Sequence, residues 1–182
     1  LTPIIYAFRE REEIIDMVEA MTGGRLTHHA FRIGGFKSDL PRDFFDRLKK
    51  FLSHFEDKVD EYEALLTNNV IFTARTRGVG ILSREKAINF GVTGPSLRGS
   101  DCAYDLRKNA AYSAYPKFDF KACAGKYVDT LDRVRVRMDE MRESAKILRQ
   151  AMETIPAGEV MAKVPRLIKP APGETYAKVE GP

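Results

Sequence analysis

The chain has 182 residues, of which 43% are hydrophobic and 31% charged, a composition typical of a globular domain with one sizeable core or two small ones. Its net charge of +4 comes from mixed basic and acidic residues, and no basic run with interleaved aromatics predicts a nucleic-acid surface. No apolar run approaches the roughly 18 residues of a membrane-spanning helix, and a start at Leu1-Thr2-Pro3, with no methionine or secretory signal, indicates an excised or processed piece.

The two cysteines, Cys102 and Cys123, stand alone in the sequence without a CxxC pair. Structural zinc and iron–sulfur sites need clustered cysteine or histidine ligands. We therefore expect no metal site within this chain and two structural rather than reactive cysteines. A GxGxxG fingerprint is also missing from the sequence, so we expect the chain itself to bind neither NADH nor a cluster.

The first predicted element is a helix that begins at Thr2-Pro3, because a hydroxyl residue followed by proline is a favourable helix start. Apolar residues then recur near helical spacing as far as Met21. The pair Gly23-Gly24 is expected to end this helix, and residues 30–33 are expected to form a short strand.

Residues 22–35 hold two glycine pairs around two arginines and two of the three histidines of the chain. Glycine pairs end regular structure and allow the backbone to approach another group closely. Arginine and histidine between them can face a charged group or a group that exchanges protons. The alternative is a helix-to-strand connection with solvated basic residues.

A second helical region is predicted from Ser38 to Leu66, as one helix or as two with a break near His54. Residues 70–73 and 78–82 are predicted to be β-prone or irregular. A capping sequence at Ser83 predicts a short helix through Phe90.

Residues 93–120 are rich in Gly, Pro, Ser and Tyr and are predicted to form a long ordered loop. Residues 127–152 show apolar spacings of three and four, which predict a long amphipathic helix. Prolines make residues 156–182 an extended tail. We therefore predict a mainly α fold over 1–182, a single helical domain built as a bundle with short β segments and long ordered loops.

Several separate motifs resemble one family in the same order along the chain. They are LTPIIYAFREREE at 1–13, MTGGRLTHHAFRIGG at 21–35, TGPSLRGSDCAYDLRKNAAYSAY at 93–115 and RVRMDEMRESAKILRQAME at 135–153. Together they are similar to the 49-kDa-type subunit of respiratory complex I, the proton-pumping NADH:quinone oxidoreductase.

The resemblance implies that the chain is the middle of a longer subunit, with the helical body shared by large subunits of nickel–iron hydrogenases. In the family this body packs against a smaller subunit that carries the terminal 4Fe–4S cluster, and quinone is reduced at their interface. The residues expected near the quinone chamber or cluster are Arg25, Thr27, His28 and Arg32. For the two arginines, fixing the loop through backbone and carboxylate contacts is an equal alternative.

The position of Thr27 is a departure from the family, which usually has there a histidine that hydrogen-bonds the terminal cluster. A hydroxyl cannot become a cation, so it stabilises the reduced cluster less than a protonated imidazole. We hypothesise a lower cluster potential that lacks pH dependence and suits menaquinone. His28 would take the role of that histidine if the loop shifts by one residue.

The resemblance also covers Arg98, Asp105 and Arg107, for which we expect structural support rather than chemistry. In the related hydrogenases this segment supports the metal pocket. The family has glycine at the position of Val128, which weakens any close backbone contact proposed there.

The function implied is that of a subunit fragment of NADH:quinone oxidoreductase on the cytoplasmic side of the cell membrane, in the peripheral arm. No residue is expected to act as a nucleophile and no cofactor to be held by the fragment, which alone should be inactive. Quinone and the iron–sulfur subunit are the expected partners, with no nucleic acid. The alternatives are the large subunit of a membrane-bound nickel–iron hydrogenase and a non-catalytic scaffold, and the electron donor could be NADH, ferredoxin or a deazaflavin.

Overall fold

The computed structural model describes residues 2–179, and these form two compact units. One unit contains the chain up to Phe55 together with residues 154–175, and the other contains 56–153 together with the segment that begins at Tyr176. The boundary falls inside one long helix, so that helix belongs in part to each unit.

The first unit is built on α1 (Thr2–Thr22) and the first half of α2 (Phe44–Leu65). Gly23 ends α1 with a φ of +81°, and its N–H donates to the Glu19 carbonyl at 2.7 Å. This is the helix end that the Gly23-Gly24 pair predicted. The core of the unit is formed by apolar side chains of both helices, namely Ile15, Met17, Leu48, Phe51 and Leu52.

A small β structure follows α1 in the same unit. Strands β1 (Phe31–Arg32) and β2 (Gly35–Phe36) pair antiparallel, close to the strand expected at residues 30–33. The tail pairs with β2 in turn, since Phe36 N–H donates to the Val160 carbonyl at 3.0 Å. A Cβ on Gly35 would lie 2.2 Å from that carbonyl oxygen, so only glycine allows the approach.

The second unit is built on the second half of α2 and on α7 (Thr130–Thr154). Arg142 of α7 donates to Asp60 of α2 at 2.6 Å and to Glu63 at 2.8 Å. The buried side chains of this unit include Val59, Tyr62, Leu131, Val136, Met138, Ala145 and Ile147. Residues 44–65 thus form one continuous helix without the break considered near His54.

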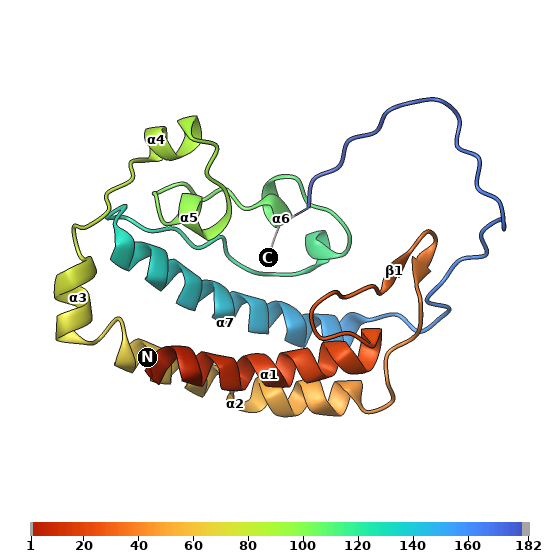
Figure 1. The fold of residues 1–182 in the computed structure, drawn as a ribbon, viewed down its shortest axis with the longest axis horizontal. Helices are drawn as coiled ribbons and strands as arrows, with labels where there is room; N and C mark the ends of the chain where they lie inside the picture. Colours follow the sequence, from red (N-terminus) through yellow and green to blue (C-terminus); the bar gives the residue numbers. More distant parts are fainter. Residues whose placement is uncertain (1, 180–182) are drawn as a thin grey trace. The chain divides into compact units, whose positions relative to one another are not determined.

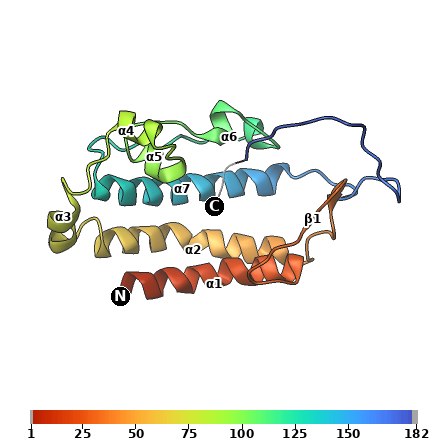
Figure 2. The same ribbon diagram turned by 45° about the horizontal axis from the view of Figure 1, so that its top comes forward.

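Short helices complete the second unit, and α5 and α6 lie beside α7 in both views (Figures 1 and 2). Their bounds are α3 Val70–Thr76, α4 Arg84–Asn89, α5 Gly94–Arg98, α6 Leu106–Asn109 and a 3₁₀ helix Tyr115–Lys117. Two predictions are therefore corrected. Residues 70–76 are helical because the Asn69 side chain accepts from two N–H groups at the start of α3. Residues 93–120 contain three short helices rather than one loop.

The structure is mainly α, as predicted, with the two short strands as its regular β structure among the described residues. Within residues 2–179, none of the helices combines the length and the apolar character that a membrane span requires. From Ile155 to Val179 the tail contains no helix.

Candidate functional site

The loop after α1 is held to that helix by Arg25. Its guanidinium contacts three carboxylates of α1, those of Asp16 and Glu19 at 2.7 Å each and that of Glu12. These acids are four and three residues apart, so they share one helix face. Hydrogen bonds to Asp16 and Glu19 raise the pKa of Arg25, which keeps it charged. The structure thus gives Arg25 the loop-fixing contacts that were one of its two expected roles.

The other three loop residues expected near a quinone or cluster are exposed. His28 Nδ1 lies 3.1 Å from the Gly24 carbonyl, so that nitrogen is directed back into its own turn. Arg32 donates to the carbonyls of His29 and Phe31 at 3.0 and 2.7 Å. Thr27 lies on the surface of the loop. Arg25, Thr27 and His28 lie in the connection that follows α1, and Arg32 lies in β1. All four belong to the first unit and are exposed to solvent.

The residues expected to give structural support belong to the second unit. Arg98 is 2% exposed, forms an ion pair with Glu140 of α7, and donates to the Tyr104 carbonyl at 3.2 Å. A buried guanidinium needs such partners because taking its charge out of water is costly. Arg98 thereby joins α5, the loop before α6 and α7.

Asp105 and Arg107 form a fork-like ion pair, with Nε and Nη2 of Arg107 donating at 3.0 and 2.8 Å. Asp105 also accepts from the Arg107 N–H and so caps α6. Burial by itself raises the pKa of the Asp105 carboxyl, but the hydrogen bonds and charge of Arg107 outweigh it, and the pKa lies below its usual value. The Arg107 guanidinium also lies 5.2 Å from the ring centre of Phe120. These contacts link Asp105 and Arg107 to each other and to Phe120, and their role as structural support stays a prediction.

Two carboxylates at the start of α7, those of Asp129 and Asp132, are buried, and their burial was not predicted from the sequence. Asp129 accepts from Gly78 N–H and Asp132 N–H at 2.8 Å each, and it is 1% exposed. Asp132 accepts from Lys126 N–H at 2.6 Å. The signal available was Asp129-Thr130 before the apolar spacing of the helix, which is a cap sequence.

The same helix start holds residues 78–82 in place. Thr130 N–H donates to the Val79 carbonyl at 3.0 Å, and Leu82 N–H donates to the Val128 carbonyl at 2.9 Å. The Arg133 side chain donates to the Gly80 carbonyl at 2.8 Å. Val128 itself has a φ of +53°, which is strained for a β-branched residue.

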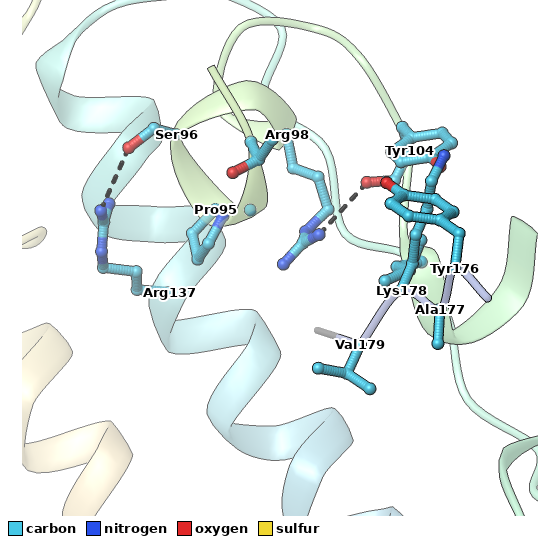
Figure 3. Close-up of a pocket in the computed structure, with 12 residues that line it drawn as sticks. Pro95, Ser96, Arg98, Tyr104, Arg137, Tyr176, Ala177, Lys178 and Val179 are labelled. Atoms are coloured by element: carbon cyan, nitrogen blue, oxygen red, sulfur yellow. Dashed lines mark hydrogen bonds between the residues drawn. The ribbon is translucent and has the colours of Figure 1, made fainter. Parts of the chain in front are cut away.

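A cavity of about 770 Å³ opens in the second unit beside Arg98. Figure 3 shows Arg98 between Pro95 of α5 and Tyr104, and the tail residues Tyr176 and Val179 also line the cavity. Arg137 of α7 donates to the Ser96 side chain at 3.4 Å. The cavity has the size of a small-molecule site, and its lining combines two arginines with aromatic and aliphatic groups.

Among residues 2–179, no three side chains of His, Cys, Asp or Glu lie close enough together to hold a metal ion. Cys123 is also poorly suited to nucleophilic chemistry. Burial, with the nearby charges of Asp139 and Glu140, raises the pKa of its thiol to about 11, so it stays protonated at neutral pH. The chemistry available to the expected site residues is therefore hydrogen bonding, positive charge and shape. This holds for the set near residues 25–32 and for the set formed by Arg98, Asp105 and Arg107.

The chain is similar over almost its whole length to proteins of one family. The family model of the respiratory-chain NADH dehydrogenase 49-kDa subunit matches residues 1–181. The D-type subunit of NADH-quinone oxidoreductase from Clostridium beijerinckii is 49% identical over 180 residues, which cover 99% of this chain and 49% of that protein. Its counterpart in Dehalococcoides mccartyi is 47% identical over 181 residues, covering 100% and 49%. A D-type subunit of Solibacter usitatus is 48% identical over 182 residues, also covering 100% and 49%. The chain thus spans about half the length of the curated relatives it matches.

Proposed function

The chain belongs to the 49-kDa subunit family of respiratory-chain NADH dehydrogenase, and from this membership we propose that it works as part of an NADH:quinone oxidoreductase. The observation that carries the proposal is the unbroken match to that family along residues 1–181. In this role the chain helps to form the quinone chamber and the contact to a terminal 4Fe–4S cluster on a smaller partner subunit.

The loop of residues 22–35 is the part of the chain proposed to face that chamber. His28, Thr27 and Arg32 are exposed there, while Arg25 contacts three carboxylates of α1. Arg32 is the cation proposed to balance the negative charge that develops when a cluster or a quinone is reduced. In this proposal Arg25 holds the loop against α1, while Arg32, Thr27 and His28 contact the cluster or the quinone.

Arg98, Asp105 and Arg107 are proposed to act at a distance from the chemistry. The Arg98–Glu140 ion pair joins α5 to α7, and the Asp105–Arg107 pair fixes the start of α6, so both help to determine the shape of the second unit. The chain is proposed to hold no cofactor of its own, to lie in the peripheral arm on the cytoplasmic side of the membrane, and to be inactive in isolation.

The proposal is tested by tagging the whole protein that carries this chain in its own host and purifying it from detergent-solubilised membranes. We expect co-purification of an iron–sulfur subunit and NADH-dependent reduction of added quinone. An Arg32→Ala variant should assemble and lose most of that activity, whereas Lys37→Ala, which removes an exposed cation just after β2, should retain it. Hydrogen-dependent dye reduction with bound nickel would instead identify a hydrogenase. A tagged protein without iron–sulfur partners would leave a scaffold.

Thr27 provides a sharper prediction within the same assembly. A Thr27→His variant places an ionisable imidazole where the family usually has one. We expect the midpoint potential of the terminal cluster to rise and to become dependent on pH between about 6 and 8, since a protonated imidazole stabilises the reduced cluster. Redox titration followed by electron paramagnetic resonance measures both effects. An unchanged, pH-independent potential in the Thr27→His variant would show that residue 27 does not lie near the cluster. A pH-dependent potential in the wild type would contradict the menaquinone hypothesis.

A further inference from the structure

Residues 70–92 of the second unit carry a net positive charge, as residues 106–126 of the same unit also do. The segment 70–92 holds four basic residues and one acid, which gives it a net charge of +3. All five charged side chains are exposed or partly exposed: Arg75, Arg77, Arg84, Glu85 and Lys86.

The same segment exposes large apolar side chains. Val79, Ile81 and Ile88 are each more than half exposed, and Phe90 is 78% exposed. Leu82 packs against a small core that contains Ala87 of α4, which brings the loop of Val79 and Ile81 next to that helix. We call these four apolar residues, with Arg77, Arg84 and Lys86, the α4 surface.

Hydrogen bonds hold the backbone of the α4 surface in place, so its apolar side chains stay exposed unless a partner covers them. Residues 78–82 are held to the start of α7 by the hydrogen bonds described above. At the other end, the Ser83 side chain accepts from Lys86 N–H and caps α4. A surface whose backbone is already ordered binds a partner at a smaller cost in entropy.

We propose that the α4 surface is a docking site for an acidic segment of a partner protein. Apolar side chains on that segment cover Phe90 and Ile81, and its carboxylates meet Arg77, Arg84 and Lys86. This inference uses only the charge and exposure of the α4 surface and does not depend on the redox role of the 22–35 loop.

The chemistry of the surface favours a protein over a lipid bilayer. Arginine outnumbers lysine, and an exposed phenylalanine lies among aliphatic residues, which is the composition of protein interfaces. Peripheral membrane binding usually uses a longer amphipathic helix. Here α3 has seven residues and α4 has six, so neither presents more than two turns.

The test uses the whole protein in its own host with the photo-crosslinking residue p-benzoylphenylalanine in place of Phe90. Tyr176, 81% exposed, receives the same residue as a control site. After irradiation, the crosslinked peptide is identified by mass spectrometry. We expect one partner-protein segment rich in Asp and Glu at position 90, and a different product or none at position 176.

Charge reversal decides whether the contact is the proposed one. Arg77→Glu with Arg84→Glu and Lys86→Glu should lower the yield of that crosslink by about tenfold or more, because like charges then face each other. Reversal of Lys117, Lys121 and Lys126, which are exposed elsewhere in the same unit, changes net charge equally and should leave the yield within about twofold. A crosslink to lipid, to another part of the same chain or to a segment without excess acid would overturn the proposal, as would a yield indifferent to charge.

Discussion

At the scale of single residues, two arginines of the chain show how the surroundings decide a role. Arg25 and Arg32 are seven residues apart and both exposed, yet Arg25 meets carboxylates, while Arg32 contacts backbone carbonyls of its own loop. For both arginines, fixing the loop was an expected alternative to a role near the cluster or quinone. Arg25 fixes the loop to α1 because one face of that helix presents Glu12, Asp16 and Glu19 to its guanidinium.

Arg25 is expected to restrain the loop that follows α1. In Arg25→Gln, backbone amides of residues 24–29 should exchange with deuterium faster than in the wild type, because the three contacts to α1 are lost. Arg25→Lys should be intermediate, since an ammonium group cannot match the fork geometry of a guanidinium. Arg47→Gln, which removes the exposed pair with Asp43, is the control. Equal exchange in all variants would mean that Arg25 does not hold the loop.

Asp105 is expected to make part of the stability depend on pH. Its pKa is lowered in the folded chain, so its contribution is complete above the ordinary value of 3.8 and is lost as pH falls through the folded value. At pH 7, Asp105→Asn should lower the free energy of unfolding by about 2 kcal/mol, the size of a hydrogen bond to a charged group. Below pH 3.8 the difference from the wild type should shrink.

Urea unfolding of both proteins at pH 7, 5 and 3 measures this dependence. Asp101→Asn, an exposed neighbour, should lower stability little at any of these values. A difference between wild type and Asp105→Asn that stays constant from pH 7 to pH 3 would show that the Asp105 charge contributes nothing.

At the scale of elements, helix ends account for what was and was not predictable. Gly23 and Ser83 have local signals for a helix end and a helix start, and the structure confirms both. No helix start was predicted at Asn69, although its side chain caps the start of α3. The β-branched residues after it favour strands, but no strand of the described chain pairs with them, so the cap prevails over intrinsic propensity.

Val128 is expected to strain the turn before α7. A positive φ costs an L-residue roughly 1–2 kcal/mol, and glycine escapes this at an entropic cost of about 0.5–1 kcal/mol. Val128→Gly should therefore raise the free energy of unfolding, by up to about 1.5 kcal/mol. Val128→Ala keeps the Cβ and removes the same methyl groups, so it should give no gain. Urea unfolding of the three proteins provides the comparison, and a less stable glycine variant would refute the strain.

At the scale of the whole molecule, the described chain leaves many large apolar side chains on its surface. On α1, Ile4 and Phe8 are 59% and 53% exposed and lie one helical turn apart. Exposed apolar surface of this kind marks contact with other protein surfaces. The two compact units each have their own buried side chains, so each satisfies the basic requirement of a core.

The isolated chain is expected to self-associate through α1. Ile4→Glu with Phe8→Lys removes two apolar groups and introduces a favourable pair at i and i+4, so α1 should stay helical. Sedimentation velocity over a concentration series should show oligomers for the wild type and mostly monomer for the variant. Circular dichroism checks that helix content is equal. Identical sedimentation of the two would exclude α1 as the contact.

The sequence by itself determined the long helices and the family. Apolar spacing over about twenty residues is a strong local signal, and the four separate motifs in order carry the resemblance. The mainly α class, the end of α1 at Gly23 and the start of α4 at Ser83 follow from such local information.

Only the tertiary structure decided which polar groups meet. Arg98 donates to Glu140, forty-two residues away, and Asp129 accepts from the Gly78 N–H, fifty-one residues away. Gly35 needs its hydrogen side chain because Val160 arrives from the far end of the chain. Contacts of this kind depend on where distant segments are placed, and a local pattern of residues carries no information about that placement.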